Sequence, residues 1–418
     1  MPKWGKNAVD WQQRVDFTKL REDRIKKANN MLHKHGIGAA IVFNWDSRRY
    51  LSSVWSHPYE KHLPVNFVLF IRDAGFPYVS AVTGFDDQRV IEDCPWLKGR
   101  IVDHDTLSQP TIIRMRTDAD QGARWKRCAE QIKSLLKQHN VDGLPVSLDY
   151  ASPAVMKALT NAGMDVVDGN AWILEADMIK TDDEIELIKQ AACCNEAGYA
   201  TLVNEFRPGM KECDAQALMA KGIYAAGAEY IEGWVVNSGS RTSPRSFNWS
   251  DRAVRPGELM SLEACHVNYC GYKTCYDRTF MVGAKPNPLQ KEVYELTVAL
   301  QHKVMDLLKP GITSADIENT RPFPPKIFNT LEDMQQFHAT WYTNHLGGIG
   351  IRWDDAPTCE GHEAETVIQK NMVISYHAIH CVNNYEGVAI ENTYRITDNG
   401  CELLTVWPFD DLMVIGYK

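Results

Sequence analysis

Apolar and charged positions alternate over the first 175 residues as expected for helices and strands in turn. Residues 20–35 carry charges with a helical period, and a short apolar run, GAAIVF, follows at 38–43. Further apolar runs cover 65–71 and 145–149, with an amphipathic stretch at 124–139 between them. Helices placed between buried strands predict a layered α/β domain over residues 1–175.

The start of a long helix predicts a second domain over residues 176–418. In MIKTDDEIELIK, residues 178–189, Thr181 followed by Glu184 forms a capping box, and Ile185 and Ile188 then share one face. Helical patterns recur at 213–226 and 289–308. Among them, two stretches of alternating apolar residues, 257–280 and 372–392, predict β-hairpins. The expected fold class is therefore α/β for the first domain and α+β for the second.

Composition narrows the possible partners and the compartment. The net charge is −9 and no basic run is present, so nucleic acid is not an expected partner. No apolar stretch approaches the ~20 residues of a membrane span, and the N-terminus lacks a signal-peptide core. Eleven scattered cysteines fit a reducing compartment, so a cytoplasmic location is expected.

The first predicted hairpin carries four chemically capable side chains. Glu263 and Cys265 alternate on one strand, and Cys275 and Asp277 alternate on its partner, so all four face one way. The alternative is a half-buried hairpin whose cysteines pack as small hydrophobic residues.

The hairpin segments GELMSLEAC, GYKTCYDRTF, MVISYH and GVAIEN resemble the paired hairpins of the pita-bread (M24, creatinase/aminopeptidase) family. The run IKTDDEIELI is similar to the start of that family's catalytic domain. The resemblance implies a creatinase-like N-terminal α/β domain, a C-terminal pita-bread domain, and a homodimer with the site near the subunit interface. The segments GAEYIE and SGSRTSP, from 227 to 244, are similar to the dimethylsulfoniopropionate lyases of this family.

The resemblance also supplies the candidate site. The metallopeptidases of the family hold two metals with two Asp, a His and two Glu, and the matching positions here are Glu263, Cys275, His345, His377 and Glu391. Since both Asp positions are altered, we expect no metal, or at most one divalent ion (Zn or Fe) on His345, His377, Glu391 and Cys265. The expected catalytic residues are Asp277, His377, His345, Glu263, Asp354 and Cys275. The expected substrate-binding residues are Tyr272, Trp341, Tyr342, Trp353, Arg352, Glu391, His57 and Lys61.

The expected function is cleavage of a C–S or C–N bond in a small zwitterionic solute. In a lyase, Asp354 or Asp277 would remove the proton α to a carboxylate, and an onium group would leave. In a creatinase-like or ectoine-hydrolase-like enzyme, Asp277 or Glu263 would act on a C–N bond and the histidines would transfer protons. Cys275 as nucleophile would need a lowered thiol pKa. A non-catalytic binding protein and an Xaa-Pro metallopeptidase are the remaining alternatives.

Overall fold

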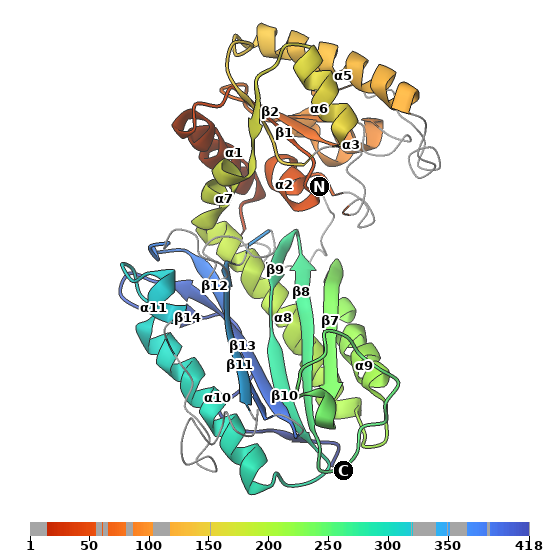
Figure 1. The fold of residues 1–418 in the computed structure, drawn as a ribbon, viewed down its shortest axis with the longest axis vertical. Coiled ribbons are helices and arrows are strands. Elements are labelled where there is room, and N and C mark those ends of the chain that lie inside the picture. Colours follow the sequence, from red (N-terminus) through yellow and green to blue (C-terminus); the bar gives the residue numbers. More distant parts are fainter. Residues whose placement is uncertain are drawn as a thin grey trace. The chain divides into compact units, whose positions relative to one another are not determined.

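The computed structural model describes residues 15–55, 61, 66–80, 87–102, 118–150, 152–318, 320, 340–348, 350–351, 366–382 and 385–417. The chain divides into two compact units, Met1–Asp177 and Met178–Lys418 (Figure 1). The boundary predicted after residue 175 falls inside α7 (Asn170–Met178). Within the described ranges, no helix is long and apolar enough to span a bilayer.

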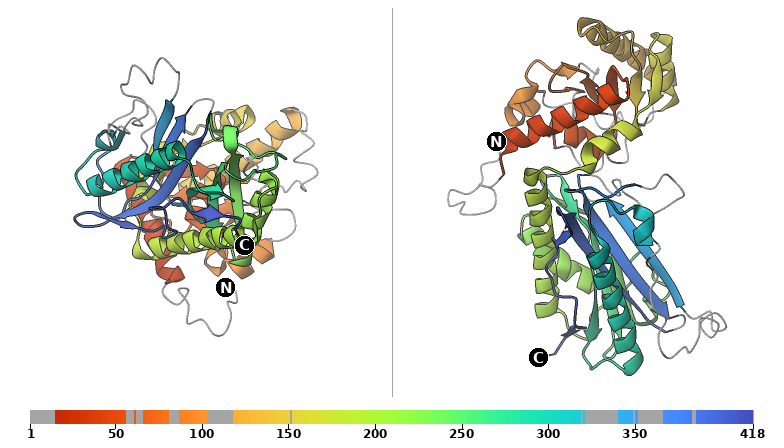
Figure 2. Two further views of the ribbon diagram at one scale, coloured as in Figure 1. Left: turned by 90° about the horizontal axis from the view of Figure 1, so that it is seen from below. Right: turned by 90° about the vertical axis from the view of Figure 1, so that its left-hand side faces the viewer.

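The first unit is a six-stranded mixed sheet with helices packed against it (Figure 2). Its strands run in the order β4-β3-β2-β1-β5-β6, and β1 pairs antiparallel with β2 but parallel with β5. The strands are β1 (Ala39–Val42), β2 (Val68–Ile71), β3 (Tyr78–Ser80), β4 (Ile101–Val102), β5 (Val146–Leu148) and β6 (Val166–Asp168). The helices are α1 (Phe17–Lys34), α2 (Trp45–Ser52), α3 (Asp87–Asp93), α5 (Asp118–Gln138), α6 (Pro153–Asn161) and α7.

One hydrophobic core holds this unit together. Ile41 and Leu69 of the sheet pack with Ile132 and Leu136 of α5 and with Leu159 of α6, and all five are buried. Helix α5 covers nearly all of the amphipathic stretch predicted at 124–139, and its apolar face packs against the sheet. The prediction of an α/β N-terminal domain is confirmed.

The second unit is built on a larger sheet with the path order β11-β12-β13-β10-β8-β7. Its strands are β7 (Tyr230–Ser238), β8 (Leu259–Tyr269), β9 (Tyr272–Thr274), β10 (Asp277–Val282), β11 (Thr340–Gly348), β12 (Val373–Val382), β13 (Gly387–Ile396), β14 (Cys401–Leu403) and β15 (Val414–Ile415). Its helices are α8 (Asp182–Glu205), α9 (Glu212–Ala225), α10 (Pro288–Leu307) and α11 (Ser314–Glu318). Helices α8 and α10 lie along the sheet (Figures 1 and 2).

Helix α8 begins with a capping box, and its middle forms hydrogen bonds with the sheet region. The predicted capping box is present, with Thr181 Oγ1 accepting from Glu184 N at 3.2 Å and Glu184 Oε2 accepting from Thr181 N at 2.7 Å. Further along, the buried Tyr199 hydroxyl lies 2.9 Å from the carbonyls of both Leu262 and Tyr276. The helix therefore supports the strands β8 and β10 directly.

The first predicted hairpin contains a break that the sequence pattern did not reveal. Strand β8 pairs with β10 at Glu263–Asp277 but with β9 at Val267–Thr274. Three residues, 264–266, therefore lie opposite two, 275 and 276, and His266 has a φ of 52°. This extra residue is a β-bulge, which bends the strand beside the candidate site.

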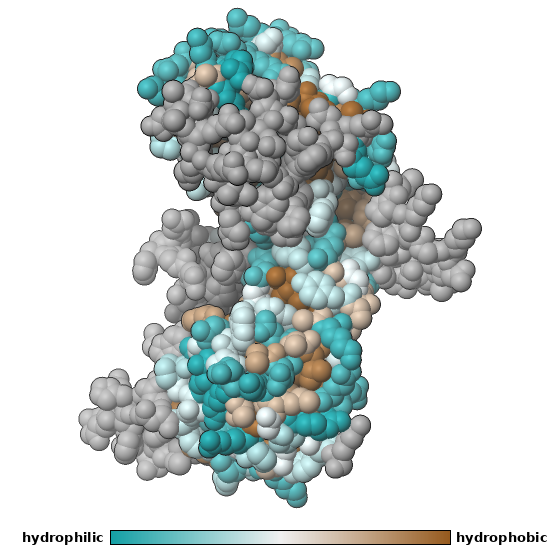
Figure 3. Space-filling view, turned by 90° about the vertical axis from the view of Figure 1, so that its right-hand side faces the viewer, coloured by the Kyte–Doolittle hydropathy of each residue, from teal (hydrophilic) through white to brown (hydrophobic). Residues whose placement is uncertain are grey.

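The surface seen in Figure 3 shows hydrophobic residues scattered among hydrophilic ones on the described part of the second unit. Large hydrophobic side chains that are exposed there include Phe247, Trp249 and Tyr224.

Candidate functional site

Strand register places five of the predicted site residues in one row across the sheet. Asp277 on β10 pairs with Glu263 on β8 and with Glu391 on β13. Glu391 pairs in turn with His377 on β12, and His377 pairs with His345 on β11. Directly opposite residues in neighbouring strands project to the same face. For His345 the structure gives the register position and not the side chain.

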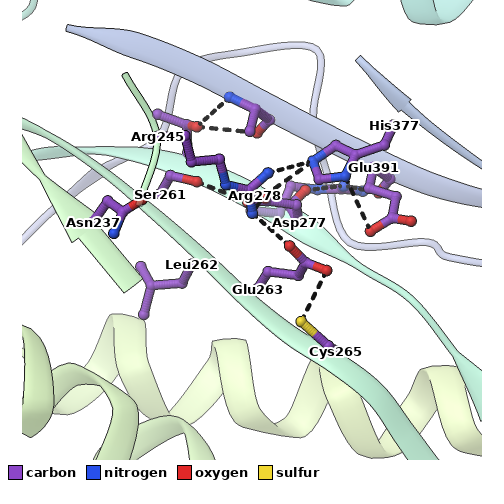
Figure 4. A network of polar contacts seen from close by, with 12 residues as sticks. Asn237, Arg245, Ser261, Leu262, Glu263, Cys265, Asp277, Arg278, His377 and Glu391 are labelled. Carbon is purple, nitrogen blue, oxygen red and sulfur yellow. Dashed lines mark hydrogen bonds and ion pairs between the residues drawn. The ribbon is translucent and has the colours of Figure 1, made fainter. Parts of the chain in front are cut away.

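An arginine that the sequence analysis did not select lies at the centre of this row (Figure 4). Arg245 Nη2 is 2.5 Å from Glu263 Oε2 and 2.5 Å from Asp277 Oδ2. Its Nη1 is 2.9 Å from His377 Nε2. The Arg245 side chain is only 3% exposed and that of Asp277 is fully buried. A permanent cation thus bridges two carboxylates and an imidazole.

The second oxygen of each of these carboxylates also has a protein donor. Glu263 Oε1 accepts from Cys265 Sγ at 3.1 Å and from Cys275 Sγ at 3.3 Å. Asp277 Oδ1 accepts from Ser261 Oγ at 3.0 Å. Both carboxylates pair with Arg245 as well, although Asp277 Oδ2 makes this contact without hydrogen-bond geometry.

Glu391 differs from the other two carboxylates. Its Oε1 accepts from Ser375 Oγ, whereas its Oε2 is buried and has no hydrogen-bond partner among the described residues. That oxygen lies 3.8 Å from His377 Nδ1. His377 Nε2 lies between two partners, 2.9 Å from Arg245 Nη1 and 3.2 Å from Asp277 Oδ2. The other ring nitrogen, Nδ1, is on the side of Glu391 Oε2.

The surroundings move the pKa values of the two glutamates in opposite directions. Burial would raise the pKa of Glu263, but the charges of Arg245 and His377 lower it well below the usual range. Burial raises the pKa of Glu391, reinforced by the charge of Glu263 and only partly offset by His377. Pairs of groups pushed apart in this way mark acid–base assignments in enzymes.

The two cysteines do not have the properties of nucleophiles. Burial, together with the neighbouring glutamates, raises the pKa of both Cys265 and Cys275. A nucleophilic thiol needs a lowered pKa. In this structure Cys275 is a hydrogen-bond donor to Glu263, and the hypothesis of a Cys275 nucleophile stays untested.

Arg278, also not selected from the sequence, fixes the backbone of the row. Its Nη1 donates to the carbonyls of Asp277 at 2.8 Å and Glu391 at 2.7 Å. Its Nη2 donates to Asn392 Oδ1 at 2.7 Å and to Trp407 O at 2.8 Å. Strands β10 and β13 are joined at the level of the site by this buried side chain.

Of the remaining predicted residues, Tyr272, Lys61, Trp341 and Tyr342 belong to the described part of the chain. Tyr272 is fully buried and donates to Glu184 Oε1 at 3.0 Å, and its assignment to substrate binding stays a prediction. Lys61 belongs to the first unit, with its Nζ 3.8 Å from Asp46 Oδ1. Trp341 and Tyr342 lie on β11 without described side chains. The predicted residues outside the described part of the chain are His57, Arg352, Trp353 and Asp354.

Two groups of side chains in the cluster bring possible metal ligands together. Glu263, Asp277 and His377 form one group, and Glu263, Cys275 and Glu391 form the other, each with ligand atoms within 4.8 Å of one another. The first group is the one that Arg245 contacts. Its oxygens are therefore already bonded to a cation.

Comparison with known proteins identifies a family whose model matches the part of the chain that holds this cluster. A model of metallopeptidase family M24 matches residues 186–398, which is 213 of 418 residues. The chain is 28% identical over 252 residues to an uncharacterized hydrolase/peptidase, y4tL, of Sinorhizobium fredii, covering 59% of this chain and 60% of that protein.

Two further relatives have assigned reactions. A creatinase of a Bacillus species is 25% identical over 341 residues, covering 72% of this chain and 80% of the relative. The dimethylsulfoniopropionate lyase DddP of Roseovarius nubinhibens is 23% identical over 300 residues, covering 68% and 65%.

Solved structures agree on the fold. An Xaa-Pro dipeptidase from Bacillus anthracis superimposes with a TM-score of 0.73 at 20% identity, covering 94% of this chain and 99% of that one. The family model spans more than half of the sequence, and the predicted pita-bread fold is confirmed. The chain therefore belongs to metallopeptidase family M24.

Proposed function

We propose that the chain is a non-peptidase M24 enzyme that cleaves a C–S or C–N bond of a small zwitterionic solute by acid–base catalysis. The observation that carries the proposal is the unequal bonding of the three carboxylates. Glu263 and Asp277 form ion pairs with Arg245, whereas Glu391 pairs with His377, whose Nδ1 lies 3.8 Å from Glu391 Oε2. A buried basic oxygen beside an imidazole nitrogen is suited to proton transfer.

Glu391 is the proposed base, in place of Asp277 or Asp354. Its raised pKa brings it closer to neutral pH, where a general base is most effective. Asp277 is fully buried and paired with Arg245, so it orients the guanidinium instead of meeting substrate. Glu263 is a weak base because its pKa is lowered. His377 Nδ1 lies 3.8 Å from Glu391 Oε2, so the imidazole is placed to exchange a proton with it.

Charge in the cluster favours a cationic substrate group. Three carboxyl groups surround one guanidinium. The Glu263 side chain is 10% exposed and the His377 side chain is 9% exposed, so solvent reaches the cluster at these two residues. A site with excess negative charge attracts a sulfonium or ammonium group. The carboxylate end of a zwitterion would then lie away from the cluster.

The lyase reaction follows from these roles. Glu391 Oε2 takes the proton from the carbon α to the substrate carboxylate, and the C–H electron pair forms the Cα–Cβ double bond. The Cβ–S or Cβ–N bond breaks and its electron pair leaves with the neutral sulfide or amine. The products are an unsaturated acid and a proton on Glu391, which returns to solvent.

A hydrolase is the second candidate, and the match over 80% of the creatinase length favours it. Glu391 would then take a proton from water as the oxygen attacks the carbon of a C–N bond. The C–N bond breaks, His377 gives a proton to the leaving nitrogen, and the proton that Glu391 took from water then returns to His377. The same residues serve both reactions, so the substrate decides between them.

The test is incubation with a substrate panel in ¹⁸O-labelled water containing a chelator. The panel contains sulfonium acids, betaines, creatine, ectoine and Xaa-Pro dipeptides, with products identified by mass spectrometry. An unsaturated acid without ¹⁸O supports the lyase, and a product carrying ¹⁸O supports the hydrolase. Cleavage restricted to Xaa-Pro dipeptides would overturn the proposal.

A further inference from the structure

We propose that Arg245 is a built-in cation that replaces the metal of the family, covering a latent divalent-cation site formed by Glu263, Asp277 and His377. The inference is independent of the substrate, since it concerns what the cluster itself binds. It predicts that this site opens only when the guanidinium is removed.

The Arg245 guanidinium lies where an ion shared by Glu263, Asp277 and His377 would bind. The ligand atoms of the three residues lie within 4.8 Å of one another, close enough to share one ion. Carboxylate oxygens and imidazole nitrogens bind zinc at ~2.0–2.2 Å. Arg245 Nη2 lies 2.5 Å from both carboxylates and Nη1 lies 2.9 Å from His377 Nε2. An ion and the guanidinium cannot occupy this space together, and their charges repel.

The segment that carries Arg245 is anchored, so the side chain is held in place. Ser243 Oγ donates to Val382 O at 2.8 Å, and Thr242 Oγ1 accepts from Gly387 N at 2.8 Å. Val382 ends β12 and Gly387 begins β13, the strands that carry His377 and Glu391. These hydrogen bonds therefore fix the backbone just before Arg245 against the end of β12 and the start of β13.

Burial makes displacement of the arginine by a metal costly. Arg245 is 3% exposed at its side chain, and Asp277 is fully buried. Removing one partner of a buried ion pair leaves the other charge uncompensated. A divalent ion from solvent would have to displace a buried charged group that is paired with two carboxylates.

The experiment titrates Co²⁺ into the full chain and into the variants Arg245→Ala and Arg245→Gln, by calorimetry and by cobalt absorption. The matched control is Arg241→Ala, because Arg241 lies on the same segment but pairs with Glu212 at 3.1 Å. Arg245→Lys is a second control that keeps a positive charge in the cluster.

We expect the Ala and Gln variants to bind one Co²⁺ per chain at least ~100-fold more tightly than the wild type, because a unit charge at this range is worth several powers of ten. Co²⁺ should also raise their melting temperature. The wild type, Arg241→Ala and Arg245→Lys should show neither effect. In Arg245→Ala, the additional change His377→Ala should weaken binding.

Two results would overturn the proposal. One is stoichiometric Co²⁺ binding by the wild type. The other is folded Arg245→Ala and Arg245→Gln protein that binds no Co²⁺. If both variants aggregate without metal, recovery of folded chain on refolding with Co²⁺ supports the proposal and failure to recover contradicts it.

Discussion

Glu263 and Glu391 occupy the same row of the sheet but have opposite electrostatic surroundings. Glu263 is paired with Arg245 and accepts from two thiols, so its pKa is lowered. Burial, together with the charge of Glu263, raises the pKa of Glu391. Glu263 therefore stabilises the fold as a carboxylate, whereas Glu391 is destabilising when ionised and suited to proton transfer.

The first prediction compares Glu263→Gln with Glu391→Gln. A group whose folded pKa is depressed contributes stability above its unfolded pKa, and this contribution is lost as the pH falls. A group whose folded pKa is raised loses its contribution as the pH rises. At pH 7, Glu263→Gln should therefore lower the melting temperature, while Glu391→Gln should leave it unchanged or raise it.

Melting curves from pH 7 down to below ~4, the ordinary range of a glutamate, check this sign. The difference between the wild type and Glu263→Gln should shrink as the pH falls. Equal destabilisation by the two substitutions at pH 7 would show that the two environments are not opposed.

The second prediction concerns catalysis by Glu391 and His377. On the substrate found with the panel, Glu391→Gln and His377→Ala should each lower kcat by ~10²–10⁴-fold, the usual effect of removing a general acid or base. In the wild type, kcat/KM should increase with pH as Glu391 ionises, at pH values above the ordinary range of a glutamate. In Glu391→Gln this increase should disappear. Near wild-type rates in both variants would remove these residues from the mechanism.

At the residue scale, strand alternation indicates that Glu263 and Asp277 share one face, whereas His377 and Glu391 are selected from the resemblance to the pita-bread family. Arg245 was missed although the selected motif SGSRTSP ends at the preceding residue. Its role depends on a contact that spans 132 residues, from Arg245 to His377, and no local pattern encodes such a contact. A positively charged residue directly after that motif was the available signal.

At the scale of elements, Glu184 connects the start of α8 with β9. One of its oxygens completes the capping box with Thr181, and the other accepts from the Tyr272 hydroxyl at 3.0 Å. Glu184 and Tyr272 are both fully buried. This junction joins the long helix to the strands next to the site.

The third prediction tests that junction. Thr181→Ala should cost about 1 kcal/mol of unfolding free energy through loss of the cap. Tyr272→Phe should cost about 1–3 kcal/mol, because the buried hydrogen bond from Tyr272 to the Glu184 carboxyl group is lost. Neither substitution should change KM if both residues have structural roles alone. Chemical denaturation and steady-state kinetics check both parts, and a raised KM in Tyr272→Phe would support its assignment to substrate binding.

The longer helices α1, α5, α8, α9 and α10 could be predicted because apolar faces and capping residues are local features, whereas the shorter helices α2, α3, α6, α7 and α11 were not predicted. The division of one predicted strand into β9 and β10 could not be predicted, since it depends on a bulge at His266 across β8. Alternation within 272–280 reads as a single strand. The extra residue on β8 is recognised only from the register of β8 with β9 and β10.

At the scale of the whole molecule, the resemblance to the pita-bread family predicts a homodimer, and the fourth prediction follows. Exposed Phe247 and Trp249, at 81% and 46%, provide apolar surface of the kind found in interfaces. Light scattering after size-exclusion chromatography should give twice the chain mass of 47.4 kDa. A single-chain mass at micromolar concentration would reject the homodimer.

The central claim is that this M24 chain performs acid–base catalysis with Arg245 as the cation of its site. The most direct test is the rate of the wild-type enzyme on its substrate before and after exhaustive chelation, with metal content measured on the same sample. We predict an unchanged rate with far less than one divalent ion per chain. A rate abolished by chelation and restored by one or two equivalents of Mn²⁺, Co²⁺ or Zn²⁺ would contradict the account.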